Sequence, residues 1–147
     1  MTLIFLLLAV AAGCLLPVQA GVNASLRLAL NHPVLAAITN FVVGLSVLAG
    51  YAAATHTRLP AASQLAMVPW WCWVGGFMGA LLVLSGVTLA HRLGAATFAA
   101  CIILGQLAAS VIVDHFGWIG FSQHSISLQR AAGMFLLATG VYLIHRS

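Results

Sequence analysis

Long apolar stretches alternate along the chain with short polar breaks, and this alternation predicts a set of membrane-spanning helices. The stretches lie at about residues 3–30, 33–54, 70–90, 95–114 and 130–145. A helix needs about 20 mostly apolar residues to cross the bilayer core. The fifth stretch is short for a span, so it either begins in the preceding loop or lies where the bilayer thins. The pattern predicts an all-α integral membrane protein with five transmembrane helices in one domain, residues 1–147.

Polar side chains recur at intervals of four inside two of these stretches. They are Gln19, Asn23 and Arg27 in the first stretch, and Gln106, Ser110 and Asp114 in the fourth. Residues four apart share one face of a helix. Within a bilayer such a face must contact protein or water. With Asn40 of the second stretch, these positions predict a substrate pathway lined by Gln19, Asn23, Asn40, Gln106 and Ser110. The alternative is that they only hydrogen-bond neighbouring helices.

Asp114 is the only acidic residue of the chain. An acid near the membrane is a candidate for coupling to an ion or a proton. Its position beside His115, at the end of the fourth stretch, also allows a structural role. In that role it pairs with an arginine or orders the following loop.

Small residues recur at helical spacing in the third and fifth stretches. Gly75 and Gly79 form a small-xxx-small pair, and Gly133 and Gly140 lie two turns apart on one face. Such positions let two helices approach closely in a membrane. We therefore expect these glycines to serve helix packing.

The composition excludes several classes of protein. The chain is 63% hydrophobic and 4% charged, whereas a soluble domain carries about 25% charged residues. Its five arginines are scattered, which argues against nucleic-acid binding and leaves the lipid bilayer as the expected partner. The three cysteines lie in apolar stretches without a CxxC spacing, where we expect buried small side chains. No acid pair or activated nucleophile is present, so we predict no catalytic residues, metal or cofactor.

The arginines are balanced between the two sides of the membrane. With five spans, Arg58 and Arg130 share a side with the N-terminus, opposite Arg27, Arg92 and Arg146. The N-terminal amine makes the two sides equal, so the positive-inside rule selects no orientation. Two interpretations follow. In the first, the orientation is determined by features outside this count or by a partner. In the second, the chain inserts both ways and pairs with an inverted copy of itself. We favour the second interpretation, an antiparallel homodimer of ten helices, because inverted repeats around a midplane site recur in transporters.

Six short motifs in fixed order resemble one known family. They are Pro17-Val-Gln19-Ala-Gly-Val-Asn23, Gly75-Gly76-x-x-Gly79-Ala80, Leu93-Gly94-Ala95-Ala96, Gly105-Gln106-Leu107, Asp114-His115-Phe116-Gly117 and Arg130-x-x-Gly133. Together they resemble the YdcZ-like five-helix membrane family of the drug/metabolite transporter superfamily. The resemblance implies a small bacterial inner-membrane transporter and exporter. It also implies that members occur as opposed pairs, as ten-helix fusions or as single chains with dual topology.

The sequence therefore predicts a dual-topology transporter of the inner membrane. We expect it to export a small polar or weakly charged solute through a cavity between two antiparallel subunits, because amides both donate and accept hydrogen bonds. The chain has no Glu, so a central carboxylate shared by cation and proton is not expected. The alternatives are an accessory or structural membrane subunit, and a channel.

Overall fold

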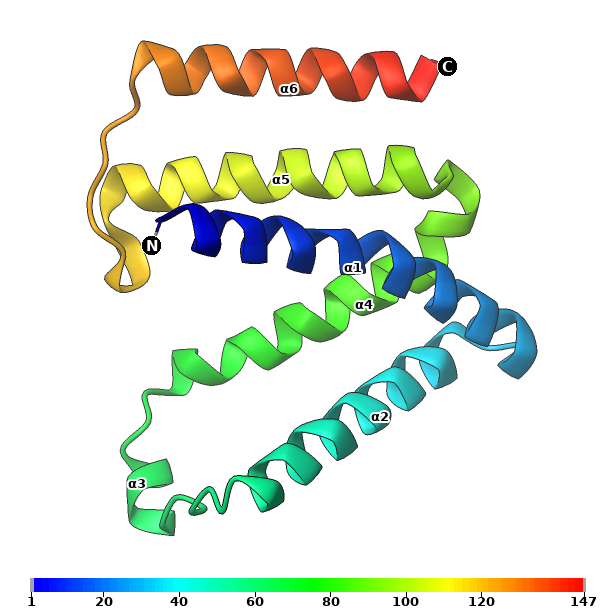
Figure 1. The fold of residues 1–147 in the computed structure, drawn as a ribbon, viewed down its shortest axis with the longest axis vertical. Helices are drawn as coiled ribbons and strands as arrows, with labels where there is room; N and C mark the ends of the chain where they lie inside the picture. The colour runs from blue at the N-terminus through cyan, green and yellow to red at the C-terminus, as the bar shows by residue number, and fades with distance from the viewer. Residues whose placement is uncertain (1, 147) are drawn as a thin grey trace. The chain divides into compact units, whose positions relative to one another are not determined.

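The computed structural model describes residues 2–146, and every regular element in that range is helical (Figure 1). The elements are α1 (Thr2–Leu30), α2 (Pro33–Ala54), α3 (Ala62–Ala66), the 3₁₀ turn η1 (Trp70–Trp73), α4 (Val74–Leu93), α5 (Ala95–Phe116), the 3₁₀ turn η2 (Trp118–Gly120) and α6 (Leu128–Arg146). The predicted all-α class is confirmed. The five long helices match the predicted stretches to within a few residues.

Four of these helices, as far as residues 2–146 are described, are long and apolar enough to cross a membrane. They are Leu3–Leu30, Pro33–Ala54, Trp70–Leu93 and Ala95–Phe116. Helix α6 has 19 residues, but it carries Gln129 and Arg130 in its first turn and His145 and Arg146 in its last. These ends lower its hydropathy below that of the other four. The fifth span therefore stays a prediction.

Backbone geometry explains where the long helices end. Asn31 adopts a left-handed φ of 52°. His32 is extended, and Pro33 begins α2 with a ring that suits the first helical position. Gly117 follows α5 with a φ of 65°, the usual glycine arrangement after a helix C-terminus. These breaks follow from local sequence and need no tertiary contact.

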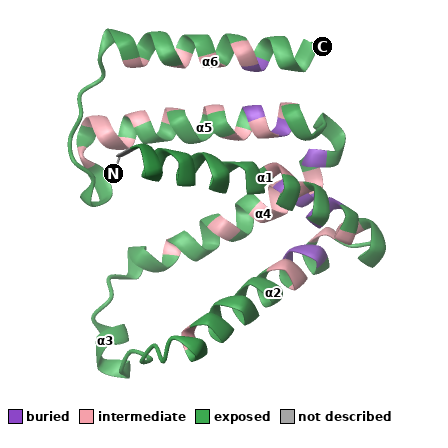
Figure 2. Ribbon diagram, viewed as in Figure 1, coloured by how far each residue is buried: buried purple, intermediate pink, exposed green. Residues whose placement is uncertain are grey.

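The chain divides into two compact units, residues 1–92 and 93–147. In the first, the end of α1, the start of α2 and the second half of α4 contain the buried residues (Figure 2). Several of these are small, namely Ala24, Ala36, Ala37 and Ala90, with Val87 fully buried. Small side chains allow close packing of helices in membranes. The prediction that residues 1–147 form one transmembrane domain stays a prediction.

In the second unit, α5 and α6 lie side by side and antiparallel, joined by the loop at residues 117–127 (Figure 1). The first turn of α6 begins at a serine cap. The Ser127 hydroxyl accepts a hydrogen bond of 3.3 Å from the Arg130 amide, as expected for a serine just before a helix.

Most large apolar side chains on the helices are exposed, including Leu45 at 68% and Phe135 at 72%. A surface of this kind is suited to lipid rather than to water. The cysteines, Cys14, Cys72 and Cys101, are free and exposed. The prediction that they are buried is therefore wrong for this chain, because Cys14 and Cys101 lie on uncovered faces of α1 and α5 and Cys72 lies in the exposed turn η1. Among residues 2–146, no group of three or more His, Cys, Asp or Glu could hold a metal ion.

The glycines predicted to pack helices meet no neighbour within the described chain. A Cβ added at Gly75, Gly79, Gly133 or Gly140 would find nothing within 4 Å. Close approach at these positions therefore requires a surface that is not part of the described residues. Their packing role stays a prediction.

Candidate functional site: the polar helix faces and the α5–α6 clasp

The polar face of α1 passes from an exposed to a buried environment along the helix. Gln19 is exposed, Asn23 is only 5% exposed, and Arg27 is partly buried. The Arg27 guanidinium donates a hydrogen bond of 3.3 Å to the Val87 carbonyl of α4. The predicted stripe is therefore present, and its last member connects two helices of the same unit.

Asn23 is the one polar residue classed as buried among residues 3–146. Its amide makes no hydrogen bond to the described residues, although an amide can both donate and accept. Asn40 on α2 is partly buried. Asn23 precedes the Asn31–His32 turn on α1, and Asn40 follows that turn on α2 at the same distance along the chain. Both amides thus belong to the same level of the α1–α2 pair, about 12 Å of helix from the turn.

The other predicted pathway residues, Gln106 and Ser110, belong to the second unit. Both are exposed on α5, four residues apart, and Asp114 continues the same face as a partly buried residue. Ser110 and Asp114 line one cleft between α5 and α6. Gln19, Asn23 and Asn40 belong to the first unit, so the structure groups the five predicted residues into two sets.

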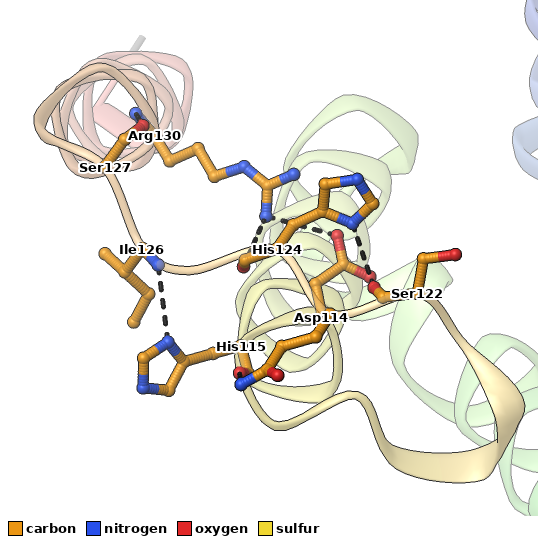
Figure 3. Close-up of polar contacts among 8 residues, drawn as sticks. Asp114, His115, Ser122, His124, Ile126, Ser127 and Arg130 are labelled. Atoms are coloured by element: carbon orange, nitrogen blue, oxygen red, sulfur yellow. Dashed lines mark hydrogen bonds and ion pairs between the residues drawn. The ribbon is translucent and has the colours of Figure 1, made fainter.

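Asp114 forms an ion pair with Arg130 of α6 (Figure 3). The distance between Arg130 Nη1 and Asp114 Oδ2 is 3.2 Å, and the two side chains are 34% and 30% exposed. The same Nη1 donates to the His124 carbonyl at 3.3 Å. Pairing with an arginine is the structural role foreseen for Asp114, whereas its coupling role stays a prediction.

The loop at residues 117–127 is held to the end of α5 by further hydrogen bonds (Figure 3). The His124 amide donates to the Asp114 carbonyl at 2.7 Å, and the Ile126 amide donates to His115 Nδ1 at 3.3 Å. The Gln123 side chain donates to the His115 carbonyl at 3.1 Å. An Nδ1 that accepts a hydrogen bond carries no proton, so this bond requires neutral His115 protonated on Nε2.

We call Asp114, His115, Gln123, His124, Ile126 and Arg130 the clasp. Two of its backbone acceptors, the Asp114 and His115 carbonyls, belong to the last turn of α5, where carbonyls have no partner inside the helix, and the third, the His124 carbonyl, belongs to the loop. The sequence analysis did not predict that His115, Gln123 and His124 hold the loop to α5. The signal that was present is a polar doublet at the end of a helix, followed by amide and imidazole side chains in an aromatic, glycine-containing loop.

Two clefts accompany these faces, one in each unit. The first has a volume of about 340 Å³ and lies between α2 and α4, where its walls are apolar. Its lining residues are Val34, Ala37, Ile38, Phe41, Val42, Leu45, Ala80 and Leu84. None of the predicted pathway residues lines it, and no sequence pattern distinguishes its walls from other apolar helix faces. The second is the α5–α6 cleft, of about 270 Å³.

Comparison with known proteins agrees with this helical membrane architecture. Residues 4–143 match the family described as "Putative inner membrane exporter, YdcZ". No curated protein and no solved structure matches the chain. The family match confirms the family that the six motifs indicate. Because it spans nearly the whole chain, the protein belongs to the YdcZ family of inner membrane exporters.

Proposed function

We propose that this multi-pass inner membrane protein exports a small polar or weakly charged solute through a cavity between two chains of opposite orientation. The observation that carries the proposal is Asn23. The residue is only 5% exposed and its side chain makes no hydrogen bond among residues 2–146, yet no side-chain N or O atom in that range is both fully enclosed and without a partner, so the Asn23 amide keeps some accessible area. An amide that is nearly enclosed by protein, still accessible and without a protein partner can donate to and accept from a solute or a second chain.

Polarity on the neighbouring helices supports a solute with hydrogen-bonding groups. Gln19 lies one turn before Asn23 on α1, and Asn40 lies at the same level of α2. All three are amides, which recognise neutral polar groups as well as weak charges. In the second unit, Gln106 and Ser110 present the same chemistry on α5. Together they would line a polar path if the two units, or two chains, face one another.

Charge balance supports the antiparallel arrangement. The N-terminal amine, Arg58 and Arg130 face the same side when five helices span, and Arg27, Arg92 and Arg146 face the other. The count requires α6 as the fifth span. Its residues 131–144 carry no charge, and a short helix of this kind is accommodated when flanking arginines extend to the headgroups.

The first experiment measures the orientation of the C-terminus. One reporter that is active only in the cytoplasm and one that is active only outside are fused after residue 147. We expect signal from both reporters. Matched variants then add one lysine on either side, Ser63→Lys in the short helix α3 that follows α2 and His32→Lys in the turn that precedes α2. Because the positive charges on the two sides are equal, the two lysines should shift the reporter ratio in opposite directions.

A single orientation that neither lysine shifts would contradict the antiparallel homodimer. If both orientations are seen, liposomes of purified protein test export with a panel of polar solutes. We expect Asn23→Ala to reduce the rate far more than Asn31→Gly, which removes an exposed amide in the turn and keeps its positive φ accessible. Absence of any solute movement from the purified protein would instead support an accessory subunit, and flux without saturation would support a channel.

A further inference from the structure

The α5–α6 cleft has a charged end and an apolar wall. Asp114 and Arg130 form the charged end, and the wall consists of Leu107, Val111 and Met134. Gly133 also lines the cleft, where a Cβ would meet nothing within 4 Å. The absent side chain leaves this part of the cleft open.

With α5 and α6 both taken as spans, the charged end would lie at the level of the lipid headgroups. Asp114 is in the last turn of α5, and Arg130 is in the first turn of α6. Two exposed aromatic rings lie close by, Phe116 at the end of α5 and Trp118 at the start of η2, and they stack with 4.8 Å between centroids. Aromatic side chains collect at the level of the lipid headgroups. Leu107 precedes Asp114 by seven residues, so the wall extends about 10 Å toward the membrane centre.

Both charged groups retain unused hydrogen-bonding capacity. Only Nη1 of Arg130 makes contacts, to Asp114 and to the His124 carbonyl. A guanidinium carries five N–H groups, so most of its donors are unused among residues 2–146. The Asp114 carboxylate receives a hydrogen bond on Oδ2, and Oδ1 is without a donor in the same range. A ligand with an anion and an N–H cation on one short headgroup would match both.

We propose that this cleft binds a phospholipid with a primary ammonium headgroup. The phosphate accepts hydrogen bonds from the free N–H groups of Arg130, and the ammonium donates to Asp114 Oδ1. One acyl chain follows the apolar wall toward the membrane centre. The volume of about 270 Å³ is small for a drug-like ligand, and it suits a headgroup with the first part of one chain. This inference is independent of the exported solute and of the dimer.

The test uses the full-length protein in detergent with equal amounts of phosphatidylethanolamine and phosphatidylcholine that carry identical acyl chains. Native mass spectrometry measures the ratio of the two lipids retained. The trimethylated headgroup of phosphatidylcholine has no N–H to donate. We expect a preference for phosphatidylethanolamine on the order of tenfold, the size of one hydrogen bond to a charged acceptor. Asp114→Asn should abolish the preference, and Arg146→Gln, at the other end of α6, should preserve it.

A second variant keeps the test valid if Asp114→Asn disturbs the loop. Gly133→Leu fills the open part of the cleft without touching the ion pair, and we expect it to reduce retention of both lipids. Equal retention of the two lipids by the unmodified protein would overturn the proposal, as would an unchanged preference in Asp114→Asn. Displacement of the lipid by soluble phosphoethanolamine at the same headgroup concentration would also overturn it, by indicating a site for a free solute.

Discussion

From the contacts of the clasp we predict that its two charged residues, Asp114 and Arg130, stabilise the loop at residues 117–127 to different extents. Arg130→Gln removes two hydrogen bonds, one to the Asp114 carboxylate and one to the His124 carbonyl. Asp114→Asn removes only the ion pair and keeps a side chain of the same shape. The backbone bond from the His124 amide to the Asp114 carbonyl is unaffected by either change. We therefore expect the arginine substitution to loosen the loop more.

The expected size of each effect follows from exposure and geometry. The side chains of Arg130 and Asp114 are 34% and 30% exposed and share a single contact of 3.2 Å. Exposed ion pairs contribute about 0.2–1 kcal/mol, and hydrogen bonds to charged groups about 1.5–3 kcal/mol. We take about 1 kcal/mol for the pair and about 1 kcal/mol for the Arg130–His124 bond, below the range for charged groups because this bond is exposed and 3.3 Å long. Local opening then becomes about fivefold easier for Asp114→Asn and about thirtyfold easier for Arg130→Gln.

Amide hydrogen exchange measured by mass spectrometry reads this opening directly. The informative peptides cover residues 117–127, which include the bonded amides of His124 and Ile126. Peptides from α2 serve as an internal control, because that helix belongs to the other unit. Arg146→Gln serves as the matched charge control, since its guanidinium lies over the Tyr142 ring and not in the clasp.

The reasoning fails if Asp114→Asn accelerates exchange as much as Arg130→Gln does. It also fails if the effects of the two substitutions simply add in the double variant, because a real pair is counted twice when the single effects are summed. Faster exchange in α2 of the same size would show that the whole protein, rather than the loop, has been destabilised.

Three further substitutions test the packing and the helix ends. Val87→Ala removes a fully buried side chain and should lower the free energy of unfolding by about 1–2 kcal/mol. Val47→Ala, at a residue that is 67% exposed, should change it little. Denaturation in mixed detergent compares the two variants. Gly117→Ala places a side chain at a φ of 65° and should cost about 1–2 kcal/mol. Gly44→Ala on α2, where a Cβ meets nothing within 4 Å, should not destabilise. Ser127→Ala removes the cap of α6 and should cost about 1 kcal/mol, seen as faster exchange in the first turn of α6; an unchanged first turn would contradict the cap.

Local sequence sufficed for the helices, because their ends are decided by residues next to one another. Pro33 cannot continue a preceding helix and is well suited to begin one. Gly117 adopts the left-handed conformation that ends α5. The same local reasoning found the helix α6 but does not decide whether it spans the membrane, because its polar ends reduce its apolar length. It misjudged the cysteines, because residence in an apolar helix does not say which face is covered.

The sequence by itself determined that this is a helical membrane protein, where its helices lie, and to which family it belongs. These properties depend on composition, short motifs and hydrogen bonds within single helices. Only the tertiary structure decided what Asp114 contacts. Its partner Arg130 lies 16 residues away, beyond a loop that must fold back before the two side chains can meet. Tertiary structure also decided that Asn23 is buried while Gln19, one turn away on the same face, is exposed. Burial depends on which helices lie opposite each position, and spacing along one helix carries no information about its neighbours.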